Sequence, residues 1–225
     1  MHSVYYPSRR ISMKSMNMTR ELDPRIASYL AKNRYDKIRQ KQDTNDFIFK
    51  WRQWAESKDY KPPIPFKEMQ KKGREREDGT VIVLACTDPR VTPEEFLGMS
   101  TDEGNKATVV RTAGGRVHAA MSTLLVLSAV GNLGKKGVIM VVHHTDCGLQ
   151  TASDDEIRSV LGEGVGMEGK EVLDGAVFGS FVTPEESVKE DVEILRASPF
   201  FKGMQIVGFV QDTETGLLSA VVNLE

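Results

Sequence analysis

VIVLACTDPR, residues 81–90, decides the fold: it is a short apolar run, rich in β-branched residues, that ends in polar side chains. A second segment, VIMVVHHTDCG over residues 138–148, repeats this design. Short apolar runs of this kind are typical of strands buried on both faces of a parallel sheet. The two segments therefore predict two such strands, which deliver Cys86, His144 and Cys147 at or just beyond their carboxyl ends.

The chain around these segments predicts an α/β fold with a mostly parallel central sheet flanked by helices and with an N-terminal helical extension. Residues 107–111 form a further β-branched run, and residues 118–130 predict a helix that is apolar on most faces. Strand, helix and strand in succession indicate right-handed parallel crossovers, with ligands bound beyond the carboxyl ends of the strands. Residues 205–210 and 217–222 predict a closing pair of strands.

Three parts are expected along the chain: residues 1–20, 21–79 and 80–225. The first is basic, rich in hydroxyl groups and free of acids, which is the composition of a transit peptide or of a disordered tail. The second predicts a helical extension and linker, and the third the α/β domain that carries Cys86, His144 and Cys147.

The helical extension is predicted from two stripes of apolar residues. Ile26, Tyr29 and Leu30 form a short stripe, and a second helix is expected over residues 44–57 with its start at Thr44. Its aromatic residues are expected to pack against the domain or a partner subunit rather than to stack on bases, because the flanking charges are mixed. Residues 71–78 are charged and predict a solvated linker.

Size and charge exclude several classes of function. A chain of 225 residues is one ordinary domain with an extension, and a net charge of −2 gives no reason to expect nucleic acid or an anionic membrane as partner. No apolar run reaches the roughly 18 residues of a spanning helix. Two cysteines without a secretory signal suit a reducing compartment. We expect a cytoplasmic protein, or a mitochondrial one if residues 1–20 are a transit peptide.

Cys86, His144 and Cys147 are the candidate metal ligands. Two thiolates and one imidazole suit Zn²⁺, and three protein ligands leave a position for water or substrate, as in catalytic zinc sites. The chain has only 2 cysteines, so a four-cysteine structural site is excluded. The alternative is a disulfide between the two cysteines, or thiols with no role in chemistry.

Two other patterns predict local structure. Thr92-Pro93-Glu94-Glu95 and Thr183-Pro184-Glu185-Glu186 each predict a helix start with a threonine cap. Residues 154–161 predict a short helix, and residues 162–169 a mobile loop. The GxGxxG pattern of that loop does not follow a predicted strand, so we do not expect it to bind a nucleotide.

The motifs Cys86-x-Asp88-x-Arg90, Arg111-Thr112-Ala113-Gly114-Gly115 and His144-x-x-Cys147-Gly148, in this order, resemble the β-class carbonic anhydrases, particularly their short form found in archaea, bacteria and fungi. The resemblance covers about residues 81–222, and one departure is Thr112, where the family often has asparagine. It implies an α/β fold around a mostly parallel sheet, a homodimer or higher homo-oligomer, and reversible hydration of CO₂ to bicarbonate.

The resemblance also implies roles for the site residues. One Zn²⁺ per subunit at the three ligands would lower the pKa of its water, so that a zinc-bound hydroxide is available near neutrality. Asp88 and Arg90 match the family's catalytic dyad: the carboxylate would accept a hydrogen bond from the hydroxide, and Arg90 would keep it ionised. The family also has a closed form, in which this aspartate becomes the fourth ligand. The alternative role for the two residues is a turn cap with a surface ion pair.

Two residues beside the candidate ligands, and two alternative functions, also have to be considered. Asp146 is a weaker candidate for a group that surrounds the metal or shapes its loop, and His143 is expected to point away from His144 as a packed histidine, with a proton relay as the alternative. A hydrolase for carbonyl sulfide or carbon disulfide could use the same zinc ligands. A non-catalytic domain stapled by zinc is the other rival.

Overall fold

The computed structural model describes residues 37–77, 79–98, 107–130 and 136–222. The chain divides into two compact units, residues 1–63 and 64–225. The predicted tail over residues 1–20 and the stripe at Ile26, Tyr29 and Leu30 lie outside the described residues.

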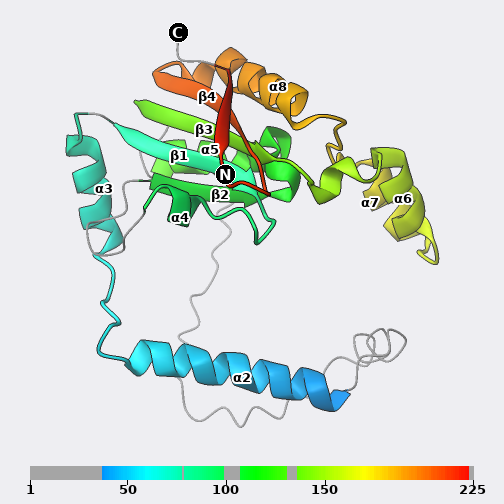
Figure 1. Cartoon of the computed structure of the whole chain (residues 1–225), viewed down its shortest axis with the longest axis horizontal. Helices are drawn as coiled ribbons and strands as arrows, with labels where there is room; N and C mark the ends of the chain where they lie inside the picture. The colour runs from blue at the N-terminus through cyan, green and yellow to red at the C-terminus, as the bar shows by residue number, and fades with distance from the viewer. Residues whose placement is uncertain (1–36, 78, 99–106, 131–135, 223–225) are drawn as a thin grey trace, which may run out of the picture. The chain divides into compact units, whose positions relative to one another are not determined.

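A five-stranded sheet in the order β2-β1-β3-β4-β5 forms the centre of the second unit (Figure 1). Four strands are parallel, and the last runs antiparallel to its neighbour. Their bounds are β1 Thr80–Cys86, β2 Ala107–Thr112, β3 Gly137–His144, β4 Met204–Gln211 and β5 Leu218–Val222. The predicted α/β fold with a mostly parallel sheet is confirmed, and so is the closing pair of strands.

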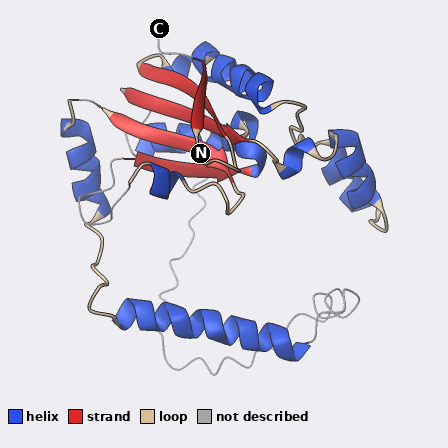
Figure 2. Cartoon of the chain, viewed as in Figure 1, coloured by secondary structure: helices blue, strands red, loops and turns tan. Residues whose placement is uncertain are grey.

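Helices α5 (Val117–Val130) and α8 (Pro184–Ala197) cover one face of the sheet and build the main core with it (Figure 2). Leu124 and Leu195 from these helices are fully buried among Ile82, Leu84 and Ile139 of the strands. The other α-helices in the described part of this unit are α3 Phe66–Glu75, α4 Pro93–Phe96, α6 Asp154–Gly162 and α7 Met167–Asp174.

The opposite face of the sheet has a smaller core. Val83, Ala85 and Val142 are fully buried there together with Val91, which follows the metal-ligand end of β1. Other apolar residues on this face, Val81, Val109 and Met140, are only half-buried.

Residues 71–75 of the segment predicted as a solvated linker are helical, because α3 extends over Phe66–Glu75, and no residue of this helix is buried. Its charges form ion pairs one turn apart, Lys72 with Glu68 at 3.0 Å and Lys71 with Glu75 at 3.9 Å. Such i,i+4 pairs stabilise a helix that buries little surface. A highly charged, solvated segment can therefore be helical.

Helix α2 of the first unit runs from Lys37 to Glu56, so the helix predicted over residues 44–57 exists but Thr44 does not begin it. Phe47, Trp51 and Trp54 have exposed side chains. The rings of Trp54 and Tyr60 meet edge to face, with their centroids 4.8 Å apart. The expected packing of the stripe against the domain or a partner stays a prediction.

The helix starts mostly agree with the sequence patterns. Thr183 caps α8 by accepting a hydrogen bond from the backbone N–H of Glu186, as predicted. Helix α4 begins at Pro93 as expected, but the Thr92 hydroxyl donates to the Glu95 carboxylate at 2.9 Å instead of capping the backbone.

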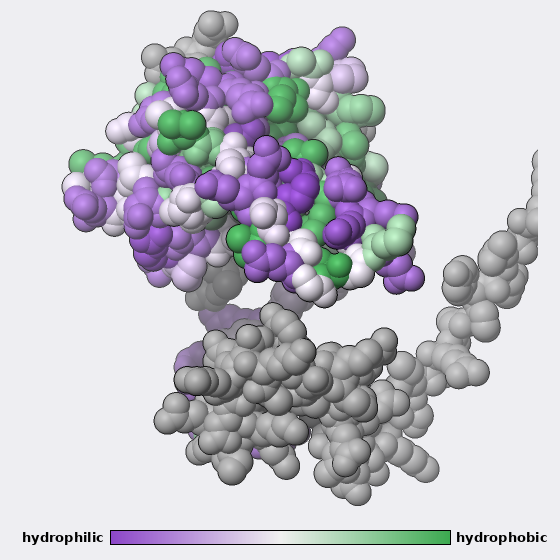
Figure 3. All heavy atoms as spheres, turned by 90° about the vertical axis from the view of Figure 1, so that its right-hand side faces the viewer, coloured by the Kyte–Doolittle hydropathy of each residue, from purple (hydrophilic) through white to green (hydrophobic). Residues whose placement is uncertain are grey.

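The loop predicted over residues 162–169 is shorter than expected, because α7 begins at Met167. Several apolar side chains of α6 and α7 stay on the surface, among them Val160, Met167 and Val172. The side of the molecule that bears these helices shows hydrophobic spots separated by hydrophilic ones (Figure 3). Among the helices of the described ranges, none has the length and apolar character needed to cross a membrane.

The close contact between α8 and β4 predicts the cost of a single methyl group at Gly208. A Cβ atom there would lie 2.3 Å from Cγ1 of Val188, a stiff and fully buried side chain. We expect Gly208→Ala to lower the free energy of unfolding by about 1–3 kcal/mol through overpacking, measured by urea denaturation.

Gly73→Ala is the matched control. Gly73 lies in α3 with no atom within 4 Å of the added Cβ, so the same change should stabilise the protein by up to about 1 kcal/mol. Equal effects of the two substitutions would contradict the packing of α8 on β4.

Candidate metal centre

Two adjacent parallel strands bring the three predicted ligands together. Cys86 is the last residue of β1, His144 is the last residue of β3, and Cys147 follows three residues later. Their ligand atoms all lie within 4.8 Å of one another, and all three residues are buried. Both cysteines are free thiols, so the alternative of a disulfide does not apply. The structure thus shows a group able to hold a metal, while the role of each residue as a ligand stays a prediction.

The hydrogen bonds of His144 prepare one ring nitrogen for a metal. Its Nδ1 donates to the carbonyl of Thr145 at 2.9 Å, which leaves Nε2 unprotonated in the neutral ring. Nε2 is buried and has no hydrogen-bond partner. A buried nitrogen left unpaired is costly, whereas a metal ion would satisfy it. The donor set of two sulfurs and one imidazole nitrogen therefore fits a soft or borderline ion such as Zn²⁺.

The two thiols influence each other's ionisation. A hydrogen bond from Cys147 lowers the pKa of the Cys86 thiol to about 4 against the opposing effect of burial, with help from His144 and from the Asp88 N–H at 3.4 Å. The pKa of Cys147 is raised by the same hydrogen bond and by burial. The pair therefore gives up its first proton readily and retains the second, which a metal must displace to bind both sulfurs.

Asp88 lies beside the ligand cluster and is held there by Arg90. The guanidinium Nε donates to Oδ1 of Asp88 at 3.0 Å, and Nη2 donates to Oδ2 at 2.7 Å. These contacts lower the pKa of Asp88 to about 2, so its carboxylate is ionised throughout the neutral range. Its Oδ2 lies 4.0 Å from Nε2 of His144. The backbone N–H of Arg90 also donates to Oδ1 at 2.9 Å, so Asp88 caps its turn as well.

Asp146 takes part in the same network, which the sequence indicated only weakly. Its carboxylate accepts a hydrogen bond from Nη1 of Arg90 at 2.7 Å, and its backbone carbonyl accepts one from Nη2 at 2.9 Å. Its φ angle is 54°, in the left-handed region. Asp146 therefore joins the loop after β3 to the pair formed by Asp88 and Arg90.

His143 points away from the cluster, as expected. Its Nε2 lies 3.3 Å from the Gly115 carbonyl and 3.3 Å from Oδ2 of Asp191, and its ring stacks on Phe181. The residue is fully buried. It is therefore a packed and hydrogen-bonded histidine.

Sequence reasoning missed the buried carboxylate of Asp191. It accepts a hydrogen bond from the Val117 N–H at the start of α5, at 3.1 Å, and lies 3.4 Å from Nε of Arg116. One signal was available: Asp191 falls among Val188, Val192 and Leu195, at the helical spacing of the core-facing stripe of α8. A charged residue in such a stripe indicates a buried polar contact.

Two further residues support the ligand loops. The Cys147 N–H donates to the side-chain carbonyl of Gln150 at 3.1 Å, and the Gln150 amide donates to the Val182 carbonyl at 3.0 Å. On the other loop, Arg111 donates to the Cys86 carbonyl at 3.0 Å. Such contacts outside the ligand set orient the ligands.

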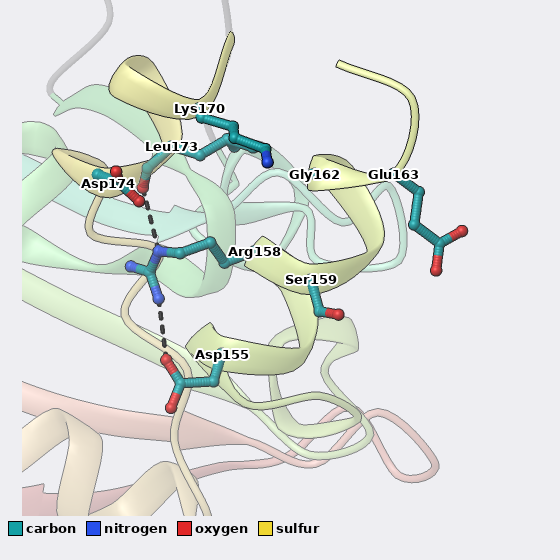
Figure 4. Close-up of a pocket in the computed structure, with 8 residues that line it drawn as sticks. All are labelled: Asp155, Arg158, Ser159, Gly162, Glu163, Lys170, Leu173 and Asp174. Atoms are coloured by element: carbon teal, nitrogen blue, oxygen red, sulfur yellow. Dashed lines mark hydrogen bonds and ion pairs between the residues drawn. The ribbon is translucent and has the colours of Figure 1, made fainter. Parts of the chain in front are cut away.

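A separate hollow between α6 and α7 contains none of the predicted site residues (Figure 4). Arg158 crosses it and donates to the Leu173 carbonyl at 3.1 Å and to Asp155 at 3.0 Å. Its side chain thus links α6 to α7. Neither of these hydrogen bonds involves a candidate metal ligand.

The chain is similar in sequence and in fold to carbonic anhydrases and to a carbon disulfide hydrolase. No model of a known protein family matches it. β-Carbonic anhydrase 1 of Mycobacterium tuberculosis is 30% identical over 142 residues, which cover 63% of this chain and 81% of that protein. A carbon disulfide hydrolase of Acidithiobacillus thiooxidans is 30% identical over 152 residues, which cover 60% of this chain and 74% of that protein.

Among solved structures, a carbonic anhydrase from Streptococcus mutans aligns with a TM-score of 0.61 at 29% identity, over 79% of this chain and 96% of that one. Sequence and fold thus agree over most of the length of these relatives. This chain belongs to the β-carbonic anhydrase family.

Proposed function

We propose that this protein catalyses the reversible hydration of CO₂ to bicarbonate, with one Zn²⁺ per subunit held by Cys86, His144 and Cys147. The observation that carries the proposal is the buried cluster itself: three ligand atoms within 4.8 Å, with the metal-facing nitrogen of His144 unpaired. A Zn²⁺ ion in this place supplies Lewis acidity, which lowers the pKa of a bound water towards neutrality.

Asp88 directs the attacking oxygen in this proposal. An ionised carboxylate only accepts hydrogen bonds, so an oxygen beside Asp88 must turn its hydrogen towards Oδ2 and its lone pair elsewhere. Arg90 keeps the carboxylate charged and fixes its plane with two parallel hydrogen bonds. The lone pair is then available to attack CO₂ in one defined orientation.

A carbon disulfide hydrolase is the second candidate, because one relative of that name is 30% identical to this chain over 74% of its own length. CO₂, carbonyl sulfide and carbon disulfide are linear molecules with an electrophilic carbon, so the same residues could direct an oxygen to any of them. The choice depends on the walls of the substrate channel rather than on the ligand cluster.

We also propose that the protein works as a homodimer. The sheet face opposite α5 and α8 carries a row of paired apolar residues, Val109, Val83 and Met140, whose outer members are half-buried. Parallel sheets are normally covered on both faces, and a second copy of the chain would complete this cover. Light scattering should give the mass of two chains, and the mass of one chain would contradict this assembly.

Replacement of Asp88 separates catalysis from metal binding. We expect Asp88→Asn to keep zinc at the wild-type level, because no ligand is changed, and to lower kcat/KM for CO₂ hydration by about 10²–10⁴-fold. Stopped-flow hydration assays and metal analysis of the same samples measure the two effects.

Cys147→Ala is the companion variant and should lose both zinc and activity. A wild-type protein with bound zinc but no hydration or hydrolysis activity would identify the metal as a structural staple. An Asp88→Asn variant with the wild-type rate would remove Asp88 from the mechanism.

Substrate preference is tested on the zinc-loaded wild type. We expect CO₂ hydration to be faster than sulfide release from carbon disulfide or carbonyl sulfide at equal substrate concentration. Faster sulfide release, abolished in Cys147→Ala, would replace the first candidate with the second.

A further inference from the structure

Arg90 is bound by both loops that carry metal ligands. On its own loop, which follows Cys86, it donates to both carboxylate oxygens of Asp88. On the loop between His144 and Cys147 it donates to the side chain and to the backbone carbonyl of Asp146. All three guanidinium nitrogens are therefore engaged, with acceptors on two segments that are distant in sequence.

The contacts with Asp146 have a different effect from those with Asp88. Asp88 and Arg90 lie two residues apart on one loop, so their ion pair alone leaves them free to move together relative to the ligands on the other loop. Backbone pairing of β1 with β3 ends at Ala85 and Val142, before either loop begins. Within the part of the chain that the structure describes, the hydrogen bonds that join these two loops, apart from contacts between the candidate ligand side chains, are those from Arg90 to Asp146.

We propose that Asp146 is a positioning residue for the reaction: it anchors Arg90, and through it the Asp88 carboxylate, to the loop that carries His144 and Cys147. This inference rests on the proposed function and adds a third member to the pair that directs the attacking oxygen. Without the anchor, Asp88 can leave its place at 4.0 Å from Nε2 of His144 and enter the ligand set.

Because the ion pair between Asp146 and Arg90 is exposed, an effect on positioning can be distinguished from an effect on the stability of the fold. The side chain of Asp146 is 75% exposed and that of Arg90 is 51% exposed. Exposed ion pairs contribute little to the stability of a fold. Removal of the Asp146 carboxylate should therefore leave the melting temperature almost unchanged while it alters the site.

The backbone of Asp146 determines the choice of variant. Its φ of 54° is tolerated by glycine and asparagine, whereas most other residues would be strained there. Asp146→Gly thus removes the carboxylate and keeps the turn. Asp146→Asn keeps one neutral acceptor and should rescue part of the effect.

The experiment compares Asp146→Gly, Asp146→Asn and wild type, each with zinc and with Co²⁺ in its place. We expect Asp146→Gly to keep its full metal content, to lower kcat/KM for CO₂ about ten- to hundredfold, and to shift the visible absorption of Co²⁺ as Asp88 approaches the metal. The kcat/KM and the Co²⁺ absorption of Asp146→Asn should lie between those of Asp146→Gly and those of the wild type. Asp155→Asn, which removes the charge from an exposed ion pair with Arg158 that involves none of the candidate ligands, is the control.

The proposal is overturned if Asp146→Gly alters neither the Co²⁺ spectrum nor kcat/KM by more than Asp155→Asn does. The spectrum does not depend on the substrate. If the wild type fails to hydrate CO₂, the proposed function falls, and the spectrum of Asp146→Gly still decides whether Asp146 positions Asp88.

Discussion

The parallel pairing of β1 with β3 is the interaction on which the site depends. Because the two strands run in the same direction, their carboxyl ends meet at one edge of the sheet, and Cys86 and His144 arrive there together. Antiparallel strands would place these residues at opposite edges. Gly115 lies close to both strand ends: a Cβ atom there would be 3.1 Å from the Val142 carbonyl and 3.3 Å from the Ala85 carbon, and its φ of 74° suits glycine.

Two kinds of charge surround this edge, and they differ in their energetics. Asp191 and Arg116 are buried behind it, where an unpaired charge would be very costly, and they form an ion pair at 3.4 Å. Asp191 also binds the N-terminus of α5, where the helix dipole favours a negative charge. The charges in front, Arg90 and Asp146, are more exposed and more easily rearranged. The buried pair thus belongs to the interior of the scaffold, whereas the exposed pair joins the two loops that follow β1 and β3, where the proposed positioning would act.

Membership of the family indicates the type of chemistry more firmly than it indicates the substrate. A β-carbonic anhydrase and a carbon disulfide hydrolase are similar to this chain at the same 30% identity. Hydration of CO₂ and hydrolysis of carbon disulfide share the attack of an activated oxygen on a linear molecule. In the proposed mechanism the ligands and the directing carboxylate would serve either reaction, so discrimination would have to come from groups that line the approach to the metal.

The sequence by itself determined the α/β class, the strands that carry the ligands, and the three residues that meet, because apolar runs and metal-binding side chains are local patterns. It did not determine α3, whose charged residues proved to be helical pairs, or the start of α2 before Thr44. Only the tertiary structure decided that Asp191 lies under the site and that Asp146 shares Arg90 with Asp88. These contacts join residues more than 50 positions apart, and such distances are closed by packing of the sheet and its helices rather than by any local pattern.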